Sequence, residues 1–141
     1  MEVRRLCNGD EAAACEVVRV HKEREVTLEY MRAFLGDERH WLVAALDGGR
    51  PVGFALAYEL ARVDATRNKV LFYEIEVSED HRRQGIGRAL VEELKQLCRA
   101  RGCRTMFVPT DEENVAAMHF YAALGGVRQR TDEAAFEWYF E

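Results

Sequence analysis

The chain has 141 residues, enough for one domain with a hydrophobic core and too few for two domains of ordinary size. With 48% hydrophobic and 32% charged residues, its composition is that of a globular protein and excludes a disordered chain. The net charge of −5 argues against a nucleic-acid-binding protein and is compatible with a cationic small-molecule or peptide substrate. We therefore expect one domain, covering residues 1–141.

The sequence also bears on location and metal content. No stretch approaches the roughly 18 consecutive apolar residues of a membrane span, and the first residues lack the apolar core of a secretory signal. We therefore expect a cytoplasmic protein that does not act at a membrane. The four cysteines include no CxxC pair and have no histidine at zinc-like spacing, so we expect reduced thiols and no metal site.

The first third of the chain predicts a strand and two helices. Residues 2–7 have the pattern of a short strand. Residues 8–23 predict a helix that begins near Asn8 or Asp10, and residues 27–37 predict a second helix, which Thr27 can cap and Gly36 can end. The apolar stripe of the first helix consists of Ala14, Val17, Val18 and His21.

Three strands are predicted next. Residues 40–46 and 51–60 are joined by "DGGR", a strong hairpin signal, and a second connection leads to a strand at residues 69–77. In that last strand, alternation predicts one apolar face and one face that carries two carboxylates. The apolar face would contain Leu71, Tyr73, Ile75 and Val77, and the other face Phe72, Glu74 and Glu76.

The C-terminal part predicts a helix over residues 87–102, a strand over 103–109, a short helix over 114–124, and a last pair of strands in 126–131 and 134–140. Gly102 can form the left-handed end of the first of these helices. Helices and mostly antiparallel strands in this order predict an α+β, or mixed α/β, layer fold.

The sequence "HRRQGIG", residues 81–87, lies between a predicted strand and a predicted helix. Glycines allow backbone N–H groups to approach a ligand closely, and the start of a helix adds partial positive charge, so the turn predicts a phosphate-binding site. The P-loop pattern GxxxxGK[ST] is absent, and Leu90 stands where a dinucleotide fingerprint has its third glycine.

The remaining pattern, Arg82-x-x-Gly85-x-Gly87, resembles the acetyl-coenzyme-A signature of the Gcn5-related N-acetyltransferase (GNAT) superfamily. The later segment "NVAAMHFYAALGG" is similar to a second motif of the same superfamily. Within this superfamily, the segment "FYEIEVSEDHRRQGIG" is most similar to the small aminoglycoside 3-N-acetyltransferases. Glu74 stands where an aspartate is expected in their best-known members, which leaves an acid in place and alters the geometry toward the substrate.

This resemblance implies a twisted sheet of six to seven strands, about four flanking helices, and a splay between strands 4 and 5. It implies acetyl-coenzyme A as the acetyl donor and a homodimer. The pyrophosphate and pantetheine would bind to a set of residues that spans both motifs. This set is Ile75, Val77, Arg82, Arg83, Gln84, Gly85, Ile86, Gly87, Arg88, Asn114 and Tyr121.

The chemistry of acetyl transfer assigns further roles within this resemblance. An amine must lose a proton before it attacks a thioester, and the departing thiolate must gain one, so we expect Glu74 as the general base and Tyr121 as the general acid. A polyamine sugar would need several carboxylates. The candidates are Glu25, Glu29, Glu74, Glu76, Asp111, Glu112 and Glu113.

Several alternatives remain open from the sequence. The arginines can be a solvated turn, Glu74 and Glu76 can face water, Tyr121 can be a core residue, and the acidic loops can be solvated. The histidines have no ligand or triad spacing and are assigned to structure or surface. The acceptor can be another small amine, a polyamine or a peptide, and the chain can be a non-catalytic acetyl-coenzyme-A-binding module.

Overall fold

The computed structural model describes residues 1–129 and 134–140. Within this part, the chain divides into two compact units, Met1–Pro109 and Thr110–Glu141, and each is described by itself. The prediction of a single domain over residues 1–141 stays a prediction.

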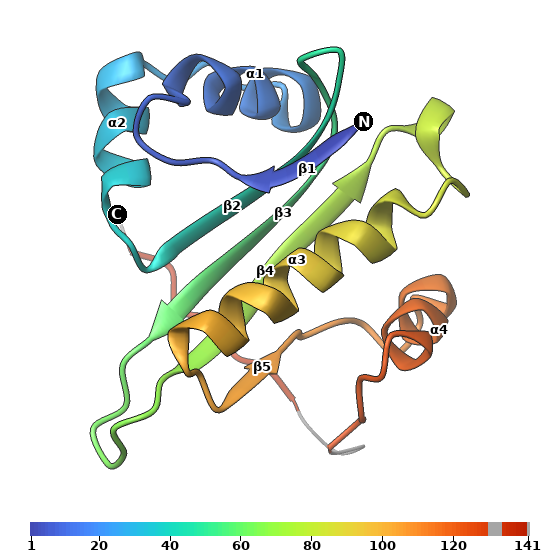
Figure 1. Cartoon of the computed structure of the whole chain (residues 1–141). Coiled ribbons are helices and arrows are strands. Elements are labelled where there is room, and N and C mark those ends of the chain that lie inside the picture. Colours follow the sequence, from blue (N-terminus) through green and yellow to red (C-terminus); the bar gives the residue numbers. More distant parts are fainter. Residues whose placement is uncertain (130–133, 141) are drawn as a thin grey trace. The chain divides into compact units, whose positions relative to one another are not determined.

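The first unit contains the sheet, with strands in the order β1-β2-β3-β4-β5 (Figure 1). The first four strands are antiparallel, and β5 is parallel to β4. Helices α1 and α2 cover one face of the sheet and α3 covers the other. The elements are β1 (Glu2–Arg5), α1 (Glu11–Lys22), α2 (Leu28–Gly36), β2 (His40–Asp47), β3 (Arg50–Leu60), β4 (Lys69–Val77), the short 3₁₀ helix η1 (Glu79–His81), α3 (Ile86–Arg101) and β5 (Thr105–Phe107).

The order of helices and strands up to residue 109 agrees with the sequence prediction. Thr27 caps α2 by accepting a hydrogen bond from the Tyr30 N–H, and Gly102 ends α3 in the left-handed conformation. Helix α2 ends at Gly36, but its cap is Asp37 in an extended conformation. The apolar sides of α1 and α2 pack against the sheet and form a buried core. Members of this core include Leu6, Ala14, Val17, Met31, Leu35, Leu42, Ala44 and Phe54.

The number of strands is smaller than predicted. The described part of the chain contains five strands, where the resemblance implied six to seven. Neither residues 126–129 nor residues 134–140 form a strand, and residues 130–133 lie outside the described residues. Alternating side chains favour extended backbone, but a strand also needs a neighbouring edge to pair with, and a sequence pattern does not supply one.

A β-bulge in β4 changes which side chains share a face. The register with β3 pairs Leu56 with Glu74 but Ala57 with Phe72, so Tyr73 is an extra residue. Because Leu56 and Ala57 point to opposite faces of the sheet, so do Glu74 and Phe72. The prediction that Phe72 shares the face of the carboxylates is therefore wrong. Phe72 is buried, whereas Tyr73, predicted on the apolar face, is 58% exposed.

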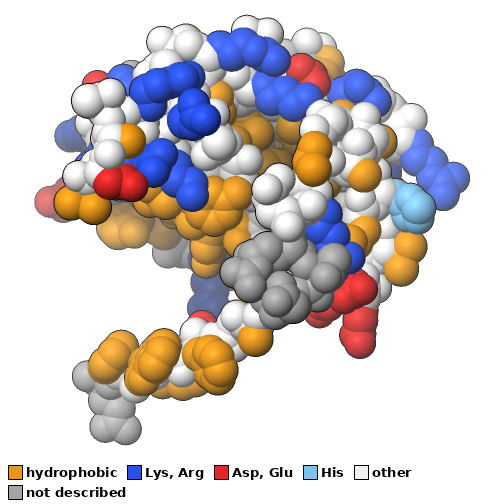
Figure 2. Space-filling model, turned by 90° about the horizontal axis from the view of Figure 1, so that it is seen from below, with side chains coloured by type: hydrophobic (Ala, Val, Ile, Leu, Met, Phe, Trp, Pro, Cys, Tyr) orange, Lys and Arg blue, Asp and Glu red, His pale blue; other side chains and the backbone are white. Residues whose placement is uncertain are grey.

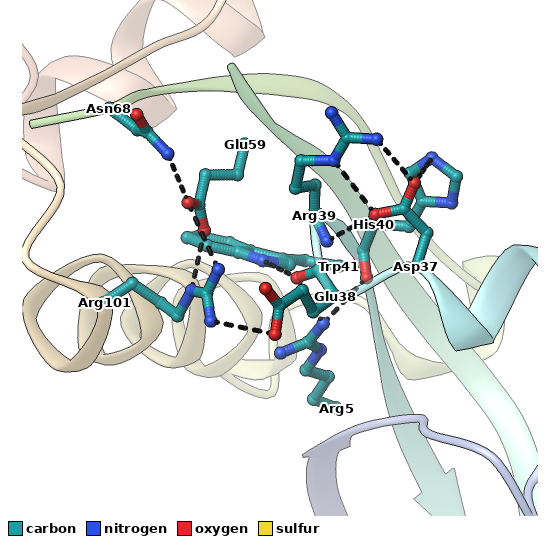
Figure 3. A network of polar contacts seen from close by, with 9 residues as sticks. All are labelled: Arg5, Asp37, Glu38, Arg39, His40, Trp41, Glu59, Asn68 and Arg101. Atoms are coloured by element: carbon teal, nitrogen blue, oxygen red, sulfur yellow. Dashed lines mark hydrogen bonds and ion pairs between the residues drawn. The ribbon is translucent and has the colours of Figure 1, made fainter. Parts of the chain in front are cut away.

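A polar network ties the end of α3 to β3 and to the chain before β2 (Figure 3). The Glu59 side chain is only 4% exposed and accepts hydrogen bonds from Arg101 Nε at 2.8 Å and Asn68 Nδ2 at 2.6 Å. Burial alone raises the pKa of Glu59, but the hydrogen bonds from Arg101 and Asn68 outweigh it and hold the pKa below its usual value. Arg101 also pairs with Glu38, at 3.5 Å.

The second unit contains helix α4 (Val115–Ala123). The Asn114 side chain caps this helix by accepting a hydrogen bond from the Ala117 N–H at 3.1 Å. After α4, the aromatic side chains of the segment 134–140 are exposed, and hydrophobic side chains are visible on it in Figure 2. They are Phe136, Trp138, Tyr139 and Phe140.

Candidate active site

The glycine turn lies between β4 and α3, as predicted. Gly85 is the N-cap residue of α3 and has φ +80°, a left-handed conformation that glycine adopts without steric cost. A Cβ added at Gly85 would meet nothing within 4 Å, so the space in front of this turn is open. Arg83 is also left-handed, with φ +63°. The chain therefore turns sharply here, and its backbone at Gly85 is exposed.

Hydrogen-bond donors and cationic side chains surround the turn. The Ala89 N–H donates to the Gly85 carbonyl at 3.0 Å, whereas the preceding N–H groups at the start of a helix have no acceptor within it. Arg82, Arg83 and Arg88 are exposed around the turn, and Arg82 Nε donates to the Val77 carbonyl at 3.2 Å. Backbone N–H groups, a helix N-terminus and cationic side chains together suit a phosphate ligand.

The edge of β4 that faces away from β3 is open over its second half. Pairing between β4 and β5 covers only Lys69–Leu71. The Ser78 N–H, just after β4, donates to the Val52 carbonyl of β3 at 2.8 Å. In an antiparallel pair, every second residue bonds to the neighbouring strand, and the residues between them direct their N–H and C=O groups to the opposite edge. Ile75 and Val77 belong to the second group. The open edge can therefore accept an extended ligand as an added strand.

The two carboxylates of β4 both contact the end of α1. Lys22 Nζ lies 2.7 Å from Glu74 Oε2, and His21 Nδ1 lies 3.8 Å from Glu76 Oε1. Glu74 is the more enclosed of the two acids, with 28% of its side chain exposed against 45% for Glu76. The predicted base therefore has a cationic partner that sequence reasoning missed, because nothing in the sequence relates position 22 to position 74.

His21 is buried among apolar groups. Its side chain is 2% exposed, its ring lies 5.3 Å from that of Phe54, and its Nε2 atom has no hydrogen-bond partner in the described part of the chain. Burial lowers the pKa of His21, and the nearby Glu76 carboxylate opposes that shift only in part. Its assignment to structure from the sequence agrees with this environment.

A pocket of about 240 Å³ lies beside Glu74, between α1, α2 and the sheet. Aliphatic and sulfur-containing side chains form much of its wall, namely Val17, Val18, Val26, Met31, Leu42 and Leu56. Four aromatic side chains complete the apolar wall, namely Tyr30, Phe34, Phe54 and Tyr58. The charged groups at the pocket are Lys22, Arg24 and Glu74.

Tyr58 connects this pocket to the bulge. Its ring lies edge-on to that of Tyr73, with centroids 5.7 Å apart, and edge-on to that of His40. Burial raises the pKa of Tyr58, and the neighbouring Tyr73 and Glu74 add to the shift. Tyr58 therefore keeps its phenolic proton at neutral pH and acts as a polar end of an otherwise apolar wall.

Of the carboxylates predicted to hold a polyamine, only Glu74 lines this pocket. Glu25 and Glu29 are exposed and do not line it, and Glu76 contacts His21 instead. The acids of the "TDEEN" segment lie in the second unit. There, Asp111 accepts a hydrogen bond from the Glu113 N–H at 3.0 Å, and Glu112 pairs with Arg128 at 3.4 Å.

The two predicted site residues of the second unit have local roles. The Asn114 side-chain oxygen is engaged as the cap of α4. Tyr121 is half-buried on α4, and burial raises its pKa. A raised pKa leaves this tyrosine with its proton at neutral pH, as a general acid requires.

Known proteins are similar to this chain in sequence and in fold. A model described as the Acetyltransferase (GNAT) family matches residues 8–125. The chain belongs to this family. GNAT acetyltransferases use acetyl-CoA as the acetyl donor. The match includes both the glycine turn and helix α4, so the two motifs noticed in the sequence both lie within it.

A curated relative matches part of the chain. The [ribosomal protein bS18]-alanine N-acetyltransferase of Escherichia coli (strain K12) is 30% identical over 88 residues, which are 62% of this chain and 55% of that protein. The chain thus spans about half the length of this curated relative.

Solved structures match over nearly the whole chain. The aminoglycoside acetyltransferase HMB0005 from an uncultured soil metagenomic sample is 29% identical, with a TM-score of 0.83 and 98% of each chain covered. The aminoglycoside acetyltransferase meta-AAC0020, from a similar sample and solved with sisomicin, is 20% identical, with a TM-score of 0.82, 99% of this chain and 95% of that chain covered, and shows the shared fold.

The described residues contain no group of three or more histidine, cysteine, aspartate or glutamate side chains placed to hold a metal ion. Among the helices of residues 1–129 and 134–140, none combines the length and apolarity needed to cross a bilayer.

Proposed function

We propose that this chain transfers the acetyl group of acetyl-CoA to a primary amine by direct attack in a ternary complex. The observation that carries the proposal is the arrangement along one strand. Strand β4 has an open edge at Ile75 and Val77, leads into the Gly85 turn, and contributes Glu74 to the adjacent pocket. Groups suited to a donor and to an acceptor thus lie at the same place.

The donor would bind along the open edge and the turn. Backbone N–H groups from Arg83 to Arg88 suit its pyrophosphate, and Arg82, Arg83 and Arg88 add positive charge around them. The N–H groups of Ile75 and Val77 suit the pantetheine arm and the thioester oxygen, where negative charge develops during transfer. Asn114 is a further candidate for the pantetheine arm. The donor itself supplies an activated acetyl thioester.

Two proton transfers would accompany the reaction. Glu74 lies at the pocket and, as the general base, would remove a proton from the acceptor's ammonium group directly or through one water. Tyr121, which keeps its phenolic proton at neutral pH, would give a proton to the departing thiolate. The amine nitrogen forms a bond to the acetyl carbon as the bond from that carbon to sulfur breaks.

An aminoglycoside, acetylated at its 3-amino group, is the acceptor that the sequence resemblance favours. Its support is the likeness to HMB0005, an aminoglycoside acetyltransferase 29% identical over nearly the whole chain. In this proposal, Glu74 would hold one ammonium group, and the candidates for the other ammonium groups stay Glu25, Glu29, Glu76, Asp111, Glu112 and Glu113. Antibiotic resistance would then be the role of the protein, in the cytoplasm and as a homodimer.

A different small amine is the second candidate acceptor. The observation that favours it is the apolar lining of the pocket beside Glu74, at which the other two charged groups are cationic. Polyamines and peptides belong to the same alternative, and the alanine-acetylating relative acts on a protein.

Thiol release from acetyl-CoA in the presence of an amine panel tests the proposal. The panel would include gentamicin-type and kanamycin-type aminoglycosides, spermidine, a lysine-containing peptide and simple monoamines. Amine-dependent release supports acetyl transfer, and the preferred amine identifies the acceptor class. Binding of coenzyme A, measured by calorimetry, without release for any amine would indicate a non-catalytic coenzyme-A-binding module.

A further inference from the structure

We infer that the acceptor pocket accepts a singly charged amine on a compact aromatic or apolar body, rather than a polycationic sugar. This inference rests on the proposed acetyl transfer and chooses between its two candidate acceptors, in favour of the small amine and against the aminoglycoside. It follows from three properties of the pocket beside Glu74, namely its walls, its charges and its size.

The walls of the pocket favour an aromatic or aliphatic guest. Ten of the thirteen residues around it are aliphatic, aromatic or methionine. Phe54 is 2% exposed and belongs to the buried core, so the rings that a guest can contact include the partly exposed ones of Phe34, on helix α2, and Tyr58, on strand β3. Phe34 stacks on His40 with ring centroids 4.3 Å apart, so its ring is held in place. Preformed aromatic surfaces bind an apolar ring favourably and offer few partners for sugar hydroxyl groups.

The charges of the pocket disfavour a polycation. Lys22 already compensates Glu74 at 2.7 Å, and Arg24 adds a cation with no ion-pair partner among residues 1–129 and 134–140. The charges of Lys22, Arg24 and Glu74 sum to one positive charge. An incoming ammonium group can replace the Lys22 ammonium on Glu74, which exchanges one cation for another. A second and third ammonium group would find repulsion instead of a partner.

The size of the pocket points the same way. Its volume of about 240 Å³ lies below the roughly 300–1,000 Å³ of sites that enclose drug-sized ligands. It suits one ring or a short aliphatic chain with its amine directed at Glu74. Binding energy would then come from burial of this apolar body, and the amine would serve as the reacting group.

A comparison of acceptors tests the inference on the full chain. We would measure kcat/KM by thiol release for 2-phenylethylamine, ethylamine, spermidine and kanamycin. Burial of the ring predicts a kcat/KM for 2-phenylethylamine about 10-fold or more above that of each of the other three amines. A higher kcat/KM for kanamycin or spermidine than for 2-phenylethylamine would overturn the inference and leave acetyl transfer standing.

Two pocket variants make the test specific. Val26→Asp places a carboxylate in the apolar wall and should lower kcat/KM for 2-phenylethylamine about 10-fold more than kcat/KM for ethylamine, which buries less apolar surface. Arg24→Glu should raise the use of spermidine relative to 2-phenylethylamine. Arg62→Glu makes the same charge change outside the pocket, at a residue paired with Asp64, and should leave the acceptor ratios unchanged.

A binding measurement separates failure of the inference from failure of the proposed function. Calorimetry with 2-phenylethylamine in the presence of coenzyme A reports occupancy of the pocket without chemistry. Binding that Val26→Asp weakens, with no thiol release for any amine, would contradict the proposed function and support the pocket's selectivity. Absence of binding together with release for kanamycin would overturn the inference alone. Equal effects of Val26→Asp on 2-phenylethylamine and ethylamine would also overturn it.

Discussion

At the scale of single residues, Glu74 and His21 have environments that set their chemistry. Both lie where α1 meets β4, yet one is a partly exposed carboxylate with a cationic partner and the other is a buried imidazole beside Phe54 and Glu76. Replacement of Glu74 should therefore affect activity and replacement of His21 should affect stability, because of the two only Glu74 lines the pocket.

Replacing Glu74 with glutamine should lower kcat by about 10²–10⁴-fold, since the amide cannot accept a proton from the acceptor amine. Coenzyme A affinity, measured by calorimetry, should stay nearly unchanged. Glu79→Gln is the matched control, because Glu79 is an exposed glutamate just after the same strand. A Glu74→Gln enzyme with the full rate at neutral pH would show that Glu74 is not the base.

Replacing His21 should change how stability depends on pH. Burial lowers the pKa of His21 in the folded state, so as the pH falls below about 6.5 the unfolded chain takes up a proton before the folded chain does. The free energy of unfolding therefore decreases over that pH range. His21→Phe, which keeps a ring beside Phe54, should remove part of this loss. Urea unfolding at pH 7.5, 6.5 and 5.5 measures the free energy of unfolding of the wild type and the variant at each pH.

His119→Phe is the control, since it removes an exposed histidine of α4. Comparison of the two variants separates the effect of burial at position 21 from the loss of any one histidine. If His21→Phe loses stability in parallel with the wild type, His21 does not contribute to the pH dependence.

At the scale of elements, the turn before α3 and the polar network at its end position this helix on the sheet. The first feature is the proposed binding site of the donor's pyrophosphate, and the second anchors the helix to β3. Their substitutions should therefore affect different properties, ligand binding for the turn and stability for the network.

Gly85→Val should lower coenzyme A affinity about 10-fold or more, since a branched side chain would occupy the open space before the N–H groups. The left-handed backbone at φ +80° should also cost about 1–2 kcal/mol of stability. Gly48→Val is the matched control, because Gly48 in the β2–β3 turn also has a left-handed backbone, with φ +57°, and a Cβ added there would also meet nothing within 4 Å. It should lose stability and keep its affinity for coenzyme A. Undiminished affinity in Gly85→Val would contradict the proposed donor site.

Arg101→Ala should lower the free energy of unfolding by about 2–4 kcal/mol, because it leaves the buried Glu59 carboxylate without its charged partner. Arg62→Ala breaks an exposed pair with Asp64 and should cost less than about 1 kcal/mol. Chemical denaturation at pH 7 compares the two. Similar losses would mean that burial of Glu59 does not govern the energy of this network.

At the scale of the whole molecule, we propose that the exposed aromatic segment 134–140 contributes to a homodimer, because large apolar side chains left in water favour association. The sedimentation coefficient should then correspond to a dimer. The double substitution Trp138→Ser and Phe140→Ser should shift it toward the monomer. A monomeric wild-type protein would show that the homodimer prediction is wrong.

The sequence by itself determined the helices, the hairpins and the glycine turn up to residue 109, because each depends on neighbours in the chain. Thr27, Gly85 and Gly102 act within one turn of the backbone, and apolar periodicity reports which side of a helix is buried. Glu74 was singled out from the sequence because it stands in a strand directly before a recognisable turn, and its role as the base stays a prediction.

Only the tertiary structure decided what surrounds Glu74. The bulge at Tyr73 moves Phe72 to the other face, and Lys22 arrives from a helix that is distant in the chain. Neither has a local signal, because strand register and the packing of a helix on a sheet depend on contacts between separate segments. For the same reason, the aromatic alternation in residues 134–140 resembled a strand, although that segment pairs with no strand among residues 1–129 and 134–140.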